Sequence, residues 1–90
     1  MKEGMIIKLT KHAKLKLDQR NISLEDVKAV VSGPELTEPD RFDDSLIHFI
    51  GRLNDRFLRV IGKREAEEEV LVISAFFDRR ISRRMKHDKA

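Results

Sequence analysis

The sequence contains no cysteine, tyrosine or tryptophan, and only two prolines and four glycines among 90 residues. The absence of cysteine excludes disulfides and the thiolate ligands of zinc or iron–sulfur sites, and a reducing, cytoplasmic compartment is expected. With five phenylalanines as its aromatic residues, the chain offers few platforms on which single-stranded bases could stack. No apolar run approaches the ~20 residues that a membrane helix needs. We therefore expect a protein that is neither exported nor membrane-spanning.

Charge is unevenly distributed, although the net charge is only +3. Residues 2–20 carry six Lys or Arg side chains against two acids, and residues 79–90 carry six against one. The middle of the chain, residues 25–55, carries eight acids against three bases. A basic cluster on one surface is typical of a protein that binds a polyanion or an acidic protein segment. The sequence therefore predicts a partner of one of these two kinds.

The first third of the chain predicts a short strand followed by two helices. Met5–Leu9 has the apolar, β-branched character of a strand, and Lys11–Arg20 has a weak apolar stripe at helical spacing. Ser23 followed by two acids is a favourable start for the second helix. Gly33-Pro34 is expected to end that helix, with the glycine in a left-handed conformation.

The rest of the chain predicts a polar connector over Glu35–Asp44 and then an antiparallel meander. Its expected strands are Ser45–Gly51, Phe57–Lys63 and Val70–Phe77, with a hairpin loop over Arg64–Glu69. The last strand is apolar on both faces, which is typical of a central, buried strand.

The predicted fold class is α+β, with one domain over residues 1–90. Its elements follow in the order β-α-α-β-β-β, with two helices packed on one face of an antiparallel sheet. The other sheet face is expected to be partly covered, by the basic C-terminal segment 79–90, by a partner or by a second copy of the chain in a homodimer.

A first candidate site is the stripe His12, Lys16 and Arg20, which recur at intervals of four on the first helix. Such a row could bind phosphates, with His12 as an acid or base near neutral pH. The alternative is a solvated flank whose basic residues pair with nearby acids.

A second candidate is the pair His48 and Arg59, which lie in the middle of two neighbouring strands. If the register aligns them, they form a polar spot on one sheet face that could act on a phosphodiester. The alternative is the ordinary solvated side of a half-buried sheet.

A third candidate is the arginine-rich segment that follows the last strand. In a helix, its four arginines would lie within about one turn of each other: Arg79, Arg80, Arg83 and Arg84. Their guanidinium groups would form a dense array suited to bidentate binding of phosphates or carboxylates. The alternative is a solubilising tail, or a helix paired with the acids at 35–44.

No cofactor or metal is expected. The three histidines have no ligand spacing between them, and the chain has neither a glycine-rich phosphate loop nor a nucleophile elbow.

Two stretches of the sequence resemble a known superfamily. The first is the string His12-Ala13, Arg20-Asn21-Ile22-Ser23 and Glu25-Asp26-Val27. The second is Phe57-Leu58-Arg59-Val60, followed by Ile73-Ser74-Ala75 and the arginine pairs. Together they are similar to small bacterial toxin domains of the RelE/ParE/BrnT superfamily, over roughly residues 9–84.

That resemblance implies a RelE-like fold and metal-independent cleavage of mRNA, on or off the ribosome, by a toxin that a cognate antitoxin neutralises. Carried onto this chain, the phosphate-binding candidates are the arginines Arg59, Arg79, Arg80, Arg83 and Arg84. His12 or His48 would transfer protons. The chain departs from the family in having no tyrosine, and in having Asn21 where the family has glycine and Lys16 where it has arginine. The alternative is a non-catalytic module of the same fold, with a basic groove for an acidic segment of a partner protein.

Overall fold

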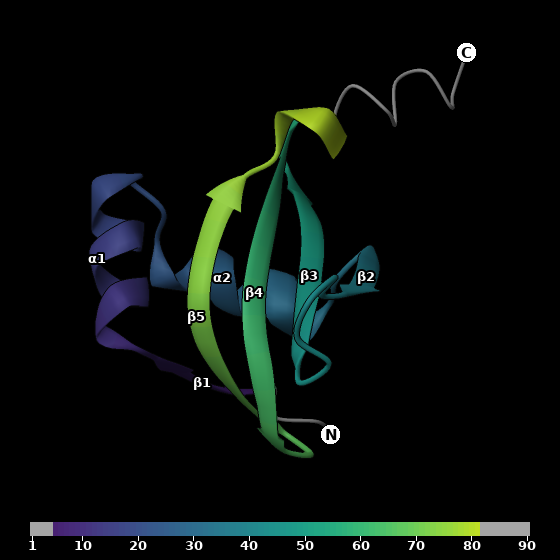
Figure 1. Ribbon diagram of the computed structural model, residues 1–90. Coiled ribbons are helices and arrows are strands. Elements are labelled where there is room, and N and C mark those ends of the chain that lie inside the picture. Colours follow the sequence, from purple (N-terminus) through teal and green to yellow (C-terminus); the bar gives the residue numbers. More distant parts are fainter. Residues whose placement is uncertain (1–4, 82–90) are drawn as a thin grey trace.

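The computed structural model describes residues 5–81 and is an α+β structure (Figure 1). Its helices are α1 (Lys11–Gln19) and α2 (Leu24–Ser32), and a further helical turn begins at Arg79. Its strands are β1 (Ile6–Leu9), β2 (Leu36–Pro39), β3 (Leu46–Leu53), β4 (Arg56–Ala66) and β5 (Glu69–Phe77). They form one sheet in the order β1-β5-β4-β3-β2.

Both helices begin at hydroxyl caps. The Thr10 side chain accepts a hydrogen bond from the amide of Ala13, and Ser23 accepts one from the amide of Asp26, each at 3.0 Å. These bonds satisfy amides that have no partner inside the helix. The cap predicted at Ser23 is therefore confirmed. The prediction of a left-handed conformation at Gly33 is wrong, because its φ is −143°. Its amide instead donates to the backbone oxygen of Ala29 and closes the last helical turn.

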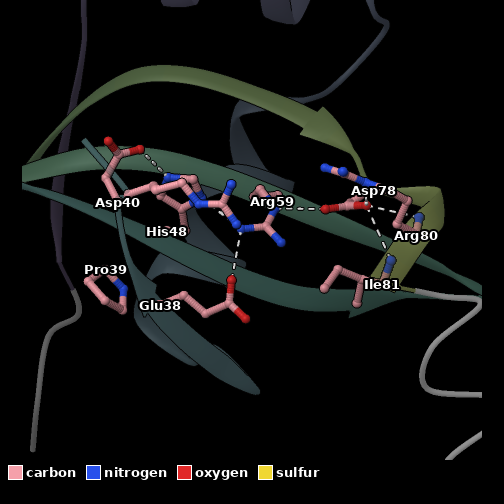
Figure 2. A pocket seen from close by; sticks show the side chains of 9 residues that line it. Glu38, Pro39, Asp40, His48, Arg59, Asp78, Arg80 and Ile81 are labelled. Atoms are coloured by element: carbon pink, nitrogen blue, oxygen red, sulfur yellow. Dashed lines mark hydrogen bonds and ion pairs between the residues drawn. The ribbon is translucent and has the colours of Figure 1, made fainter. Parts of the chain in front are cut away.

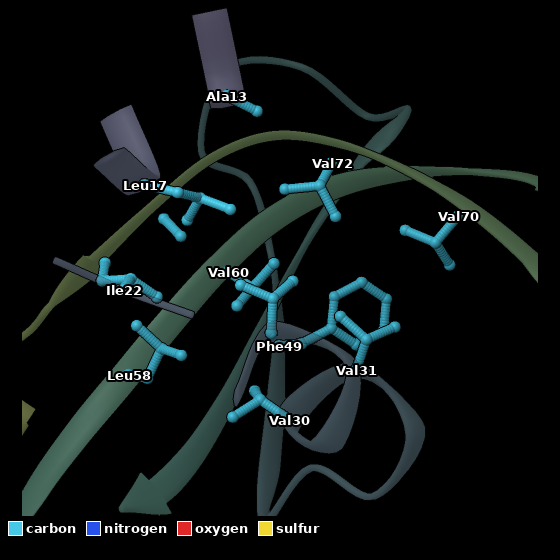
Figure 3. Close-up of a cluster of buried hydrophobic side chains, with 12 residues drawn as sticks. Ala13, Leu17, Ile22, Val30, Val31, Phe49, Leu58, Val60, Val70 and Val72 are labelled. Atoms are coloured by element: carbon cyan, nitrogen blue, oxygen red, sulfur yellow. The ribbon is translucent and has the colours of Figure 1, made fainter. Parts of the chain in front are cut away.

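The main hydrophobic core lies between the sheet and the two helices (Figures 1 and 3). Helix α1 packs on β5, and α2 packs on β3 and β4. Alternate residues of the strands point toward the helices, among them the fully buried Leu58, Val60 and Val72. Helix α2 approaches β3 so closely that a Cβ at Gly51 would lie 2.9 Å from the Val30 side chain. This close approach explains the glycine in the middle of a strand.

The opposite sheet face, which we call the open face, carries a smaller apolar cluster. Ile50 and Phe57 from neighbouring strands pack there with Ile81 from the C-terminal helical turn. Because Ile81 is 1% exposed, the start of the C-terminal segment is anchored on this face. The prediction that the open face is partly covered is confirmed for the described residues.

Two features of the sheet differ from the predicted antiparallel meander. Strand β1 pairs in parallel with β5, so the sheet is mixed. The predicted polar connector contains an edge strand, β2, in which Pro39 can sit because an edge position needs no amide donor on its outer side. Strand β5 lies inside the sheet, as predicted, but β4 is the middle strand.

The loop predicted over Arg64–Glu69 is wrong in its extent. Strand β4 continues to Ala66 and β5 begins at Glu69, which leaves Glu67 and Glu68 as the turn. None of the helices in the described part of the chain is both long and apolar enough to cross a membrane.

Candidate functional site

A cavity of about 540 Å³ opens on the open face, between β2, the middle of β3 and β4, and the helical turn after β5 (Figure 2). Its wall combines three carboxylates, Glu38, Asp40 and Asp78, with His48 and Arg59. The side chains of Arg41 and Arg80 also line it. Residues from four separate segments thus meet at one place, and the three carboxylates form a connected polar network with His48 and Arg59.

Arg59 is the centre of this network. It lies in the middle of β4 with only 8% of its surface exposed, which is unusual for an arginine. Its Nε donates to Asp78 Oδ2 at 2.8 Å, and its Nη1 lies 3.2 Å from Glu38 Oε1. Burying a guanidinium costs several kcal/mol unless it is paired and hydrogen-bonded. The two carboxylates provide that pairing.

The Asp78 carboxylate accepts hydrogen bonds both from Arg59 and from the C-terminal helical turn. While Oδ2 accepts from Arg59, Oδ1 accepts from the backbone amides of Arg80 and Ile81 at 2.9 and 3.2 Å. Burial by itself raises the pKa of Asp78, but the hydrogen bonds from Arg59 and the two amides outweigh burial and hold that pKa below its usual value. Asp78 is therefore an anionic helix cap that fixes Arg59.

His48 lies between Arg59 and Asp40. Its Nδ1 is 2.7 Å from Arg59 Nη1, and its Nε2 is 2.7 Å from Asp40 Oδ1. A guanidinium can only donate, so Nδ1 must present its lone pair and the ring proton must lie on Nε2. This assignment makes His48 a neutral imidazole that donates to Asp40.

Asp40 is held by the loop that follows β2. Its Oδ2 accepts from the amides of Phe42 and Asp43, each at 3.0 Å, while its Oδ1 faces His48. The hydrogen bond with His48, followed by the one from the Phe42 amide, lowers the pKa of Asp40. An ionised carboxylate that orients an imidazole in this way is a common arrangement for acid–base chemistry.

Acid is expected to destabilise the protein through Asp40 and Asp78, because the pKa of each carboxyl lies below its usual value. Such a carboxyl contributes stability above its unfolded pKa of about 4 and loses that contribution as the pH falls toward its folded pKa. The urea concentration at the midpoint of unfolding should therefore decrease when the pH is lowered below about 4. In an Asp40→Asn variant this concentration should decrease less over the same pH range. Asp18→Asn, which removes an exposed carboxylate from α1, is the control. An Asp40→Asn curve parallel to that of the unchanged protein would contradict the expectation.

The structure brings some of the predicted site residues together and separates others. His48 and Arg59 contact each other, although they are diagonal neighbours in the sheet: Arg59 pairs with Ile50 and His48 with Ile61. Arg80 lines the same cavity, and its side chain is 89% exposed and 3.9 Å from Asp78. Arg79 lines a neighbouring cavity. Arg83 and Arg84 lie outside the described residues.

The helix stripe does not share this site. His12, Lys16 and Arg20 belong to α1 and its C-terminal cap, and α1 packs on the sheet face opposite the cavity. Arg20 has a structural contact, since its Nη1 donates to the backbone oxygen of Ala75 at 2.8 Å and ties the end of α1 to β5. The candidates for proton transfer therefore lie on opposite sides of the sheet, and His48 is the one beside Arg59.

Sequence reasoning did not identify the three carboxylates Glu38, Asp40 and Asp78 as parts of this site. One signal was available. Arg59 stands among apolar residues in the middle of a strand, and a buried arginine requires carboxylate partners. Across residues 5–81, no group of three or more His, Asp or Glu side chains is placed to hold a metal ion.

Comparison with known proteins gives one match. The family described as "Domain of unknown function (DUF4258)" matches residues 9–77, which include β2 to β5 and both complete helices. No curated protein and no solved structure matches the chain. The family match carries no link to the RelE/ParE/BrnT superfamily.

Proposed function

Because the chain belongs to the DUF4258 family, whose function is unknown, its activity has to be argued from the site, and we propose a toxin-like RNA-cleaving domain of RelE-like fold. In this proposal, Arg59 and Arg80 bind a phosphodiester of single-stranded RNA in the 540 Å³ cavity and His48 transfers protons. The observation that carries the proposal is the 2.7 Å contact between His48 Nδ1 and Arg59 Nη1, with Asp40 on the other ring nitrogen. A phosphate-binding group, a base and a residue that orients the base are thereby adjacent.

The reaction begins when a phosphate oxygen accepts a hydrogen bond from Arg59 Nη1. That oxygen competes with His48 Nδ1 and Glu38 for the donor hydrogens, so binding of the substrate releases the lone pair of Nδ1. Asp40 keeps the ring proton on Nε2, and Nδ1 is then free to act as a base.

The chemical step is attack of the RNA 2′-hydroxyl on the adjacent phosphorus. His48 Nδ1 takes the hydroxyl proton as the new oxygen–phosphorus bond forms, and Arg59 and Arg80 stabilise the charge that develops on the phosphoryl oxygens. The bond to the 5′-oxygen then breaks, and that oxygen takes the proton back from His48. The products are a 2′,3′-cyclic phosphate and a 5′-hydroxyl, and His48 returns to its neutral form.

The test is incubation of the purified protein with a single-stranded RNA, with and without ribosomes, followed by mapping of the new ends. We expect cleavage that persists in excess EDTA and leaves cyclic phosphate ends. Induction in a bacterial host should arrest growth and create new 5′ ends inside translated messages. Intact RNA in both assays, from protein that circular dichroism shows to be folded, would contradict the proposal.

A second candidate is a non-catalytic module of the same fold that binds an acidic segment of a partner, such as an antitoxin. Two observations favour it. Arg59 already has carboxylate partners, whereas Arg79 and Arg80 remain exposed. Phe42, beside the cavity-lining Arg41, is 91% exposed, and exposed aromatic residues often anchor protein partners. Co-purification of an acidic partner that Phe42→Ala releases, without RNA turnover, would favour this candidate over the first.

A further inference from the structure

A second cavity, of about 270 Å³, lies at the end of the sheet where β4 begins and β5 ends. Its wall includes the side chains of Arg56, Phe57, Phe77 and Arg79. Asp78 lines both this cavity and the 540 Å³ cavity. The two cavities therefore meet at this residue.

Arg56 lies over the Phe77 ring in the second cavity. Its guanidinium carbon is 3.6 Å from the centre of the Phe77 ring, which is half-buried against the main core. Within residues 5–81, Arg56 forms no ion pair or side-chain hydrogen bond, and it is exposed. One face of the guanidinium thus rests on an aromatic ring, while its charge is not neutralised by an acid.

From this arrangement we propose that Arg56, supported by Phe77, is the stacking platform for one nucleobase of the RNA. The inference rests on the proposed function and adds to it a base-binding subsite. RNA-binding proteins stack unpaired bases on arginine guanidinium planes as well as on aromatic rings. The sequence offers few exposed aromatic rings, but here a half-buried ring orders an arginine whose outer face can receive a base. Arg79 in the same wall is placed to bind the backbone of that nucleotide.

The geometry also explains how the two sites cooperate. A phosphodiester at Arg59 and Arg80 lies on one side of Asp78, and the second cavity lies on the other. Arg56 and Phe77 lie on the helix side of the sheet with Leu58. The RNA strand would therefore pass around the end of the sheet at Asp78 for a nucleotide further along it to enter the second cavity. Its stacked base would then fix the position of the sugar–phosphate backbone. Positioning of this kind raises the rate of an intramolecular attack.

The experiment compares two lysine substitutions in a His48→Gln background, which slows turnover so that binding can be measured. Arg56→Lys keeps the positive charge and removes the planar guanidinium group. Arg52→Lys is the matched control, because Arg52 also lies over a phenylalanine, Phe57 at 5.8 Å, but does not line the second cavity. The probe is a labelled single-stranded RNA of about eight nucleotides, within the ~4–16 nucleotides that a single-strand-binding OB-fold covers. We expect Arg56→Lys to weaken binding by about five- to 150-fold, the range for loss of one stacked base, and Arg52→Lys to bind like its parent.

Abasic RNA gives the second measurement. If the platform stacks a base, placing an abasic nucleotide at the sensitive position should weaken binding to the parent and remove the difference between the parent and Arg56→Lys. Equal affinity of the parent and Arg56→Lys for intact RNA would overturn the base subsite and leave the proposed function standing. If the unchanged protein neither binds nor cleaves RNA but binds an acidic peptide, both the proposed function and the subsite are overturned.

Discussion

Replacing His48 by Gln is expected to slow RNA cleavage by about 10²- to 10⁴-fold, which is the usual contribution of a general acid–base group. The glutamine amide can still donate to Asp40, but it has no basic nitrogen that could take the place of Nδ1. Because His48 is only partly buried and lies outside the two apolar clusters, the variant should remain folded. The measurement is the single-turnover rate with saturating protein, which separates the chemical step from binding.

Two further variants test whether the loss of cleavage rate comes from the network of Arg59, His48 and Asp40. Asp40→Asn should reduce the rate less than His48→Gln, because it weakens the orientation of the imidazole and leaves the base in place. His12→Gln tests the competing candidate on the helical face, and should leave the rate unchanged. A large loss in His12→Gln together with full activity in His48→Gln would show that the reaction does not occur in the cavity on the open face.

Local signals in the sequence predicted most of the fold. Ser23 with its two following acids marked the start of α2, and the alternation of His48 and Ile50 with Ile47 and Phe49 predicted the two faces of β3. Such signals depend on residues close in the chain. The parallel pairing of β1 with β5 could not be predicted in this way, because it joins Ile7 to Val70 across most of the sequence.

The site was predictable only in part, for a related reason. His48 and Arg59 lie on neighbouring strands of one meander, so register reasoning could bring them together. Asp78 and Glu38 reach Arg59 from segments whose positions depend on the whole sheet. Glu38 was harder still to predict, because the acids and prolines in and beside β2 suggest a loop, and the strand forms only through pairing with β3.

The largest expected loss of stability comes from Asp78→Ala. This change leaves the Arg59 guanidinium buried beside Glu38 alone and removes the acceptor for the amides of Arg80 and Ile81. Breaking a buried ion pair by removing one partner usually lowers the free energy of unfolding by about 3–5 kcal/mol. A domain of this size has a small free energy of unfolding, so such a loss is a large fraction of it. Urea unfolding followed by circular dichroism measures the loss, with the osmolyte TMAO added if the variant is unfolded in buffer.

A double-mutant cycle separates the ion pair from the helix cap. Arg59→Met should also destabilise the protein, because it leaves Asp78 buried without its cation. The variant carrying both changes should lose clearly less stability than the two single losses added together, since neither buried charge then remains unpaired. Asp78→Asn, which keeps an acceptor oxygen for the two amides, should fall between the unchanged protein and Asp78→Ala. Strict additivity in the cycle would mean that Asp78 stabilises the protein as a helix cap alone, and that the buried Arg59 does not depend on it.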